Sequence, residues 1–207
     1  GLTTGQVSSL TTTQVAALLA GQVAALATDD VQALSTAQVA ALTTAQAGSL
    51  TSTQMTAMST AQVAAIETAD LARLGTSAVK GLSTTQVAAL TEGQVGALGS
   101  AQVQALTTAQ LAAIDASKFD ALSTAAIAGL TTAQVVALTS AQVGAITTAQ
   151  LAAMTPSQVA ALGTDDIRAL TPDHMASLTS SQVRARSTDV LVALGTTMAW
   201  LYSTVVT

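Results

Sequence analysis

An eight-residue repeat runs through the chain without a change of register. Starting at Leu2, every eighth position is Leu, Ile or Met, with the exceptions of Arg186 and Tyr202. The position five residues further along is apolar in every unit except at Thr207. The consensus unit is Leu-Thr-Thr-Ala-Gln-Val-Ala-Ala. An unbroken register of this kind is typical of proteins whose units stack on their neighbours.

The spacing of the large apolar residues argues against one long helix. It alternates between three and five residues, as from Val63 to Ile66 and from Ile66 to Leu71. Eight residues advance an α-helix by about 800°, so an apolar stripe would drift by about 80° per unit and would not stay on one face. The strict alternation expected of a half-buried strand is also absent.

Each unit instead carries the signal for a new helix start. The residue after the large aliphatic is Ser, Thr, Asp or Gly in every unit except those with Leu19, Ala27 and Glu67. Gln usually follows three positions later, which makes a capping box. In such a box the Thr43 hydroxyl accepts from the backbone of the third helical residue, and the Gln46 side chain returns to the Thr43 amide.

The variations of the repeat also favour short helices. Pro156 and Pro172 fall at the first helical position, where Pro is best tolerated. Charged residues fit the helix dipole, with acids in the first turn and bases in the last. The acids are Asp29, Asp30, Asp70, Glu92, Asp165 and Asp166, and the bases are Arg73, Lys80, Arg168 and Arg184. We predict one helix of about six residues in each unit.

Such a helix is unstable alone. Fixing eight residues costs roughly 8 to 16 kcal/mol of backbone entropy, whereas a cap contributes about 1 kcal/mol and two buried aliphatics about 3 to 6 kcal/mol. The sequence therefore predicts an all-α solenoid, a superhelix of very short capped helices, over residues 1–185. Its handedness and number of units per turn do not follow from this argument. A β-solenoid is the alternative, since Thr and Val favour strands, although the Ala, Gln and Leu content favours helices.

Two segments depart from the repeat. The first is Lys118, Phe119 and Asp120, where Phe119 either replaces Val in the core or anchors an interface. The second, residues 186–207, begins with Arg186 at an inward position and is rich in apolar and β-branched residues. We expect it to act as a cap of the solenoid or as a joint to another subunit. The candidate interface residues are Phe119, Arg186, Trp200, Leu201, Tyr202, Val205 and Val206.

Composition excludes several classes of function. Six basic residues against eleven acidic ones give a net charge of -5, which disfavours binding to nucleic acid. The chain has no Cys, so it has neither disulfides nor thiolate metal sites. Long uncharged stretches are interrupted in every unit by Thr, Ser or Gln and do not read as membrane spans. The segment from Val190 to Val206 comes closest to a membrane anchor.

The candidate chemical groups have simpler structural interpretations. His174 stands in the Gln position of its unit, and a lone His without Cys is a better capping substitute than a metal ligand. Asp29 with Asp30, and Asp165 with Asp166, lack the ligand pattern of a calcium loop. No nucleophile, base and orienting group are suggested together. We therefore expect neither an enzyme nor a bound cofactor.

The repeat resembles the Thr-, Ala- and Gln-rich octapeptide arrays of some very large secreted or surface proteins of Gram-negative bacteria. The resemblance covers nearly the whole chain and implies an extracellular fibre, stalk or adhesin segment. Residues 130–138 also resemble the first helix of transcription-activator-like effector repeats. We reject that second resemblance, because those units are longer and require a base-reading loop and a basic surface.

These observations lead to two functional hypotheses. The first is a structural segment of an extracellular or surface filament, in which identical chains join end to end. The unbroken register favours it, because a fibre requires identical increments. The alternative is a protein-binding solenoid or a spacer in a large secreted adhesin. That hypothesis predicts a contiguous exposed stripe of aromatic or charged residues at one position of the repeat.

Overall fold

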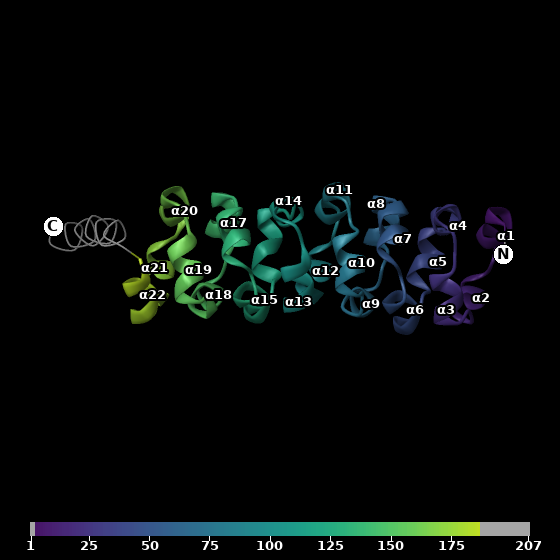
Figure 1. The fold of residues 1–207 in the computed structure, drawn as a ribbon, viewed down its shortest axis with the longest axis horizontal. Helices are drawn as coiled ribbons and strands as arrows, with labels where there is room; N and C mark the ends of the chain where they lie inside the picture. Colours follow the sequence, from purple (N-terminus) through teal and green to yellow (C-terminus); the bar gives the residue numbers. More distant parts are fainter. Residues whose placement is uncertain (1–2, 187–207) are drawn as a thin grey trace.

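The computed structural model describes residues 3–186, which form a rod of very short helices (Figure 1). Within this range, 22 α-helices and one 3-10 helix follow one another, one in each eight-residue unit. The shortest α-helix has 4 residues and the longest have 6. Residues 3–186 contain no strand. The predicted all-α solenoid is therefore confirmed, and the β-solenoid alternative is wrong.

Helices three units apart pack on one another, so the superhelix has three units per turn and three columns of helices. The first column holds α1 (Thr4–Ser9), α4 (Thr28–Ala33), α7 (Ser52–Ala57), α10 (Thr76–Lys80), α13 (Ser100–Ala105), α15 (Thr124–Ala128), α18 (Thr148–Ala153) and α21 (Pro172–Ser177). The second holds α2 (Thr12–Ala16), α5 (Thr36–Ala40), α8 (Thr60–Ala64), α11 (Thr84–Ala88), α14 (Thr108–Ala112), α16 (Thr132–Val136), α19 (Pro156–Ala161) and α22 (Ser180–Ala185). The third holds α3 (Ala20–Ala24), α6 (Thr44–Gly48), α9 (Thr68–Leu71), α12 (Glu92–Ala97), the 3-10 helix η1 (Ala116–Ala121), α17 (Ser140–Ala145) and α20 (Thr164–Ala169). The helices α1 and α22 lie at opposite ends of the rod (Figure 1).

A corner of two extended residues joins each helix to the next. After α12, Leu98 has φ -65 and ψ 120, and Gly99 follows with φ -75 and ψ 163. The Leu98 amide still donates to the carbonyl of Val95, at 3.2 Å. These extended dihedrals stop the helix and send the chain to the next column. The large aliphatic of each unit stands in this corner, which explains why the apolar spacing fits neither a long helix nor a strand.

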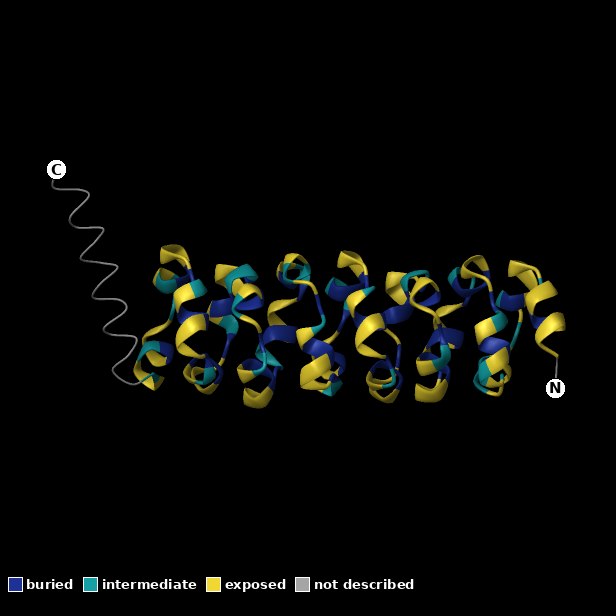
Figure 2. Ribbon diagram, turned by 90° about the horizontal axis from the view of Figure 1, so that it is seen from above, coloured by how far each residue is buried: buried dark blue, intermediate teal, exposed yellow. Residues whose placement is uncertain are grey.

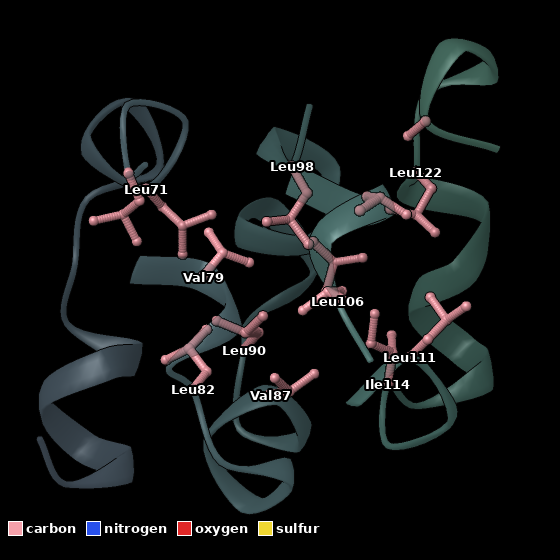
Figure 3. Close-up of a cluster of buried hydrophobic side chains, with 14 of the residues drawn as sticks. Leu71, Val79, Leu82, Val87, Leu90, Leu98, Leu106, Leu111, Ile114 and Leu122 are labelled. Atoms are coloured by element: carbon pink, nitrogen blue, oxygen red, sulfur yellow. The ribbon is translucent and has the colours of Figure 1, made fainter. Parts of the chain in front are cut away.

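The core is a continuous line of aliphatic side chains along the rod axis. The residue at the Val position and the residue at the corner both point inward, as at Val95, 0% exposed, and Leu98, 2% exposed. Figure 2 shows buried positions inside the rod and exposed positions on the outer turns. In Figure 3, Leu71, Leu82, Leu90 and Leu106 project into the space between helices of successive turns. Small aliphatics from neighbouring units fill this core, and Phe119 is its one aromatic residue within residues 3–186.

The predicted helix ends are confirmed in most units. Thr43 and Gln46 form the capping box, and Pro156 and Pro172 open α19 and α21. The acidic residues predicted for first turns lie in first turns. The bases predicted for last turns lie in last turns, with the exception of Arg73. The prediction for Arg73 is wrong, because α9 ends at Leu71. Glu67 at its start provides no side-chain cap, and this helix is the shortest.

Residues 187–207 lie outside the described part of the chain. The predicted cap or joint over residues 186–207 falls there, together with Trp200, Leu201, Tyr202, Val205 and Val206. Arg186 is the last described residue, directly after α22. Among the residues that the structure describes, no helix has the length and apolarity to cross a bilayer.

Candidate functional site: a ladder of buried glutamines

The side chain of Gln94 links two successive turns of the superhelix. Its Oε1 accepts from the Thr91 amide at 2.9 Å, which completes the capping box of α12. Its Nε2 donates to the carbonyls of Val63, at 2.9 Å, and Ile66, at 2.8 Å. Gln94 is 1% exposed. One buried amide thus caps its own helix and binds a corner 28 residues earlier in the chain.

The same arrangement recurs along the rod, and we call these residues the glutamine ladder. In each case Nε2 donates to the corner carbonyl 28 residues earlier. The ladder consists of Gln38, Gln46, Gln54, Gln62, Gln86, Gln94, Gln102, Gln110, Gln134, Gln142, Gln150, Gln158 and Gln182.

The glutamine ladder supplies hydrogen-bond donors to carbonyl groups that short helices leave unpaired. Every helix leaves its last carbonyls without an intrahelical partner, and a rod of short helices brings many such carbonyls near its core. Buried carbonyls need hydrogen-bond partners. A Gln amide has two N–H donors and an oxygen acceptor, so it satisfies a corner of one turn and the cap of the next.

The capping role of these Gln residues could be predicted from the sequence, but their donation to the previous turn was not predicted. The sequence contained a signal for it. A capping box accepts Glu as well as Gln, yet no unit has Glu at this position. A carboxylate would cap the helix equally well but has no hydrogen to donate to the corner carbonyls.

Two basic residues replace the Gln donor. Lys118 occupies a Gln position, and its Nζ donates to the carbonyl of Leu90 at 2.7 Å. Val190 stands at another Gln position, directly after the one occupied by Gln182. There Arg186 Nη1 donates to the carbonyls of Val159 and Leu162, which stand where a Gln at residue 190 would donate. Both residues therefore supply donors at places where the ladder has no Gln.

Phe119 follows Lys118 at the Val position and is fully buried, 0% exposed. Its own carbonyl accepts from Gln150 Nε2 at 3.0 Å. The side chain lies within the core, and η1 packs between α12 and α17 of the third column. Phe119, one of the residues proposed for an interface, therefore exposes no aromatic surface to a partner. Arg186, another of them, donates to corner carbonyls of its own chain.

Six units of residues 3–186 have Asp, Ala or His at the Gln position: those with Asp30, Asp70, Ala78, Ala126, Asp166 and His174. Their places are regular. Asp70, Lys118 and Asp166 follow one another at intervals of 48 residues, and so do Asp30, Ala78, Ala126 and His174. Forty-eight residues are six units, or two turns. A larger repeat of two turns is thus superimposed on the eight-residue repeat.

Glycines follow the same larger repeat. Gly48, Gly96 and Gly144 are 48 residues apart, and each faces the backbone of the helix three units later. A Cβ at Gly96 would lie 3.1 Å from the carbonyl oxygen of Ala121 at the end of η1. The divergent helices of the third column, α9, η1 and α20, therefore pack closely on helices that contain glycine. The glycines and the replaced Gln residues are thus parts of the same two-turn repeat.

Charge is concentrated in these divergent units. Thirteen of the seventeen charged residues lie in residues 19–34, 67–82, 115–130 and 163–178, which together make up less than a third of the chain. Within residues 3–186, Asp165 and Arg168 form the one ion pair, at 3.0 Å on the surface. The surface chemistry of the rod therefore repeats every two turns.

The predicted capping role of His174 is confirmed. Its Nδ1 accepts from the Thr171 amide at 3.1 Å, and its own amide donates to the Thr171 hydroxyl. Asp166 accepts from the Gly163 amide at 2.8 Å and from the Ser140 hydroxyl at 2.9 Å. Within residues 3–186, no three His, Asp or Glu side chains gather in a way that could hold a metal ion.

Asp115 caps η1 in place of Thr. Its carboxylate accepts from the Ser117 hydroxyl at 2.7 Å and from the Ser117 amide at 2.8 Å. These hydrogen bonds, with a smaller contribution from the charge of Lys118, hold the pKa of the Asp115 carboxyl below its ordinary value. The carboxyl is exposed to solvent, and it contributes only to the start of η1.

An open groove of about 640 Å³, lined by both polar and apolar atoms, crosses α4, α7 and α10. Hydroxyl, amide and ammonium groups line it, and its polar side chains belong to Thr28, Gln32, Ser52, Thr53, Thr56, Ser77 and Lys80. Thr56 of α7 donates at 2.6 Å to the carbonyl of Gly81, which follows the last residue of α10.

A family model described as the ALTTAQ repeat matches residues 23–60, 63–100, 111–148, 143–180 and 159–196. These matches cover most of the chain. The protein belongs to the ALTTAQ repeat family. Neither a curated protein nor a solved structure matches the chain. The residues Ala-Leu-Thr-Thr-Ala-Gln, which give the family its description, contain the corner Leu, the capping Thr and the ladder Gln. One ALTTAQ repeat therefore corresponds to one helix with its corner.

Proposed function

We propose that this ALTTAQ array is a non-enzymatic structural rod, a self-assembling segment or subunit of an extracellular or surface filament or stalk. The glutamine ladder is the observation that carries the proposal. It joins each turn to the next by the same hydrogen bonds, so every turn adds an identical increment of length.

The dimensions of the rod support a role as a spacer. Twenty-three helices in three columns make between seven and eight turns. At a spacing of about 10 Å between packed helices, the described residues span about 80 Å. The side chains that lie on the outside are mostly Thr, Ser and Ala, which give a uniform surface with little charge.

The extracellular or surface location rests on the resemblance of the unit to the octapeptide arrays of large secreted or surface bacterial proteins. Association with a cell surface, and the absence of nucleic-acid binding expected from the net charge of -5, belong to the same proposal.

Electron microscopy of the purified chain across a concentration series tests self-assembly. We expect filaments whose length increases with concentration, built from units of about 80 Å, and a helical far-UV circular dichroism spectrum. Dispersed short rods at every concentration would overturn the filament proposal.

The groove across α4, α7 and α10 favours a second candidate, a protein-binding solenoid or spacer. Under that function the chain remains a single short rod at all concentrations. A Lys80→Glu variant would then lose a partner that the wild-type chain retains in a pull-down from the source organism, whereas the exposed variant Arg184→Glu would keep it.

A further inference from the structure

We propose that the Asp70 carboxylate and the corner carbonyls of Val39 and Leu42 form a binding site for a hard metal cation, with calcium as the best-fitting ion. The site lies inside the rod, where α9 stacks on α6 next to the corner between α5 and α6. It goes beyond the proposed structural role and does not depend on self-assembly. Its basis is a buried carboxylate at a position where the glutamine ladder places a hydrogen-bond donor.

The corner carbonyls elsewhere along the rod converge on a positive or partly positive group. At the Gln positions they surround an amide nitrogen, as at Gln94. At Lys118 they bind a full positive charge, since its Nζ lies 2.7 Å from the carbonyl oxygen of Leu90 and 3.2 Å from that of Ala88. A corner is therefore a cluster of oxygen atoms that accepts a cation.

Asp70 reverses the charge at this position. It is 5% exposed, and among residues 3–186 its carboxylate accepts no hydrogen bond and forms no ion pair, not even with Arg73. By the 31- and 28-residue steps of the ladder, its corner carbonyls are those of Val39 and Leu42, to which no side chain of residues 3–186 donates. Buried charges in proteins are paired or coordinate metals. A carboxylate beside carbonyl oxygens therefore calls for a positive charge between them.

Asp166 demonstrates that a carboxylate at this position reaches the previous turn. It stands at the same place of its unit, in α20 of the same column, 96 residues further along. One of its oxygens accepts from the Gly163 amide at 2.8 Å, and the other accepts at 2.9 Å from the hydroxyl of Ser140, two residues after the corner residue Leu138. The Asp70 carboxylate has no such partners among residues 3–186, so its oxygens are available to a ligand.

The surroundings of Asp70 suit a partly hydrated cation. Among the described residues every fully buried side-chain N or O atom has a partner, so the unpartnered Asp70 oxygens keep a narrow contact with solvent. Glu67, the N-cap of α9, makes no cap hydrogen bond and adds a second carboxylate at the same helix end. Calcium takes about six to eight oxygen ligands from carboxylates, carbonyls and water. Those three kinds of ligand meet at this corner.

The sequence did not suggest a metal site here, because many of the ligands belong to the backbone. Within residues 3–186 no three acidic or His side chains gather as a metal cluster. The unit instead carries two departures from the repeat at once, with Glu67 in place of the capping Thr and Asp70 in place of Gln. One cation site accounts for both.

Urea denaturation of the full chain, followed by far-UV circular dichroism, tests the site with calcium as the ligand. An ion that binds only the folded chain multiplies the folding constant by one plus the ratio of its concentration to Kd. For a Kd on the order of 10⁻⁴ to 10⁻³ M, as in extracellular calcium modules, about 10 mM calcium chloride multiplies the constant about ten- to hundred-fold. Sodium chloride at equal ionic strength controls for screening of the net charge.

Two variants with the same loss of charge separate the site from the rest of the surface. Asp70→Gln removes the carboxylate and supplies the donor that the corner at Leu42 lacks, so this variant should fold and should not respond to calcium. Asp29→Asn removes one charge at an exposed position and should respond as the wild-type chain does. Isothermal titration calorimetry should detect calcium binding to the wild-type chain that Asp70→Gln lacks.

A calcium response in the wild-type chain and Asp29→Asn, absent from Asp70→Gln, supports the site. An equal response to sodium chloride, an equal response of Asp70→Gln, or no response at all would overturn it. A wild-type chain that gains stability as the pH falls through the carboxyl range, without any effect of calcium, would place a proton between Asp70 and the carbonyls and would overturn it too. None of these outcomes depends on whether the chains assemble, so the proposed filament stands or falls separately.

Discussion

The Nε2 of Gln94 lies 2.8 Å from the carbonyl oxygen of Ile66, a residue 28 positions earlier and one turn away along the rod. The same side chain caps its own helix three residues away. A contact that is local in sequence and a contact between turns therefore depend on one amide. This coupling lets helices of four to six residues, which are unstable alone, form a continuous rod.

Replacing Asp70 by Gln should stabilise the rod. Asp70 is 5% exposed, and its carboxylate makes no side-chain hydrogen bond among residues 3–186. Gln at this position would donate to the carbonyl of Leu42, 28 residues earlier. We expect the free energy of unfolding to rise by about 1 to 2 kcal/mol, measured by urea denaturation followed by far-UV circular dichroism. The exposed control Asp29→Asn should change it by less than about 0.5 kcal/mol. No difference between the two variants would refute this reading of the ladder.

Glycine substitutions should separate close packing from helix propensity. A Cβ at Gly81 would lie 2.4 Å from the carbonyl oxygen of Ser52 and 2.7 Å from its Cα, so the backbone of α7 would have to move. Gly81→Ala should destabilise the rod by about 1 to 3 kcal/mol. At Gly21 no heavy atom lies within 4 Å of the added Cβ, and Gly21→Ala should stabilise α3 by about 0.5 to 1 kcal/mol. Thermal melting of the two variants in parallel would reveal opposite shifts.

The cap of η1 should depend on pH. Because hydrogen bonds from Ser117 lower the pKa of Asp115 in the folded chain, the cap stabilises the fold above the ordinary carboxyl pKa of about 3.9. That stabilisation is lost as the pH falls through the lower folded pKa. A carbon-13 NMR titration of the Asp115 carboxyl should show a midpoint below the ordinary value. Ser117→Ala should move the midpoint upward, and an unchanged midpoint would count against the hydroxyl bond as its cause.

Much of the fold could be predicted from the sequence because its determinants are local. The capping boxes, the Pro residues at the first helical position and the eight-residue spacing all lie within single units. The assignment of His174 to a cap succeeded for the same reason, since its partner Thr171 is three residues away. The prediction for Arg73 failed because α9 ends at Leu71, two residues before it, and nothing in the sequence marks that early end.

The long-range features could not be derived in this way. Three units per turn follow from how helices stack across turns, a relation that the spacing within one unit does not fix. The larger repeat of two turns was present in the sequence at Gly48, Gly96 and Gly144. Its meaning required the structure, which places these glycines against the divergent helices of the next turn.

The central claim is that the glutamine ladder holds successive turns together, and a pair of alanine variants tests it most directly. Gln94→Ala removes a cap contact and leaves the corner at Ile66 without its donor, whereas Gln104→Ala removes an exposed side chain on the next helix. We predict that Gln94→Ala lowers the free energy of unfolding by about 2 to 4 kcal/mol and exposes the Thr91 amide to faster hydrogen exchange, while Gln104→Ala changes neither. Equal stability and equal exchange in the two variants would contradict the account.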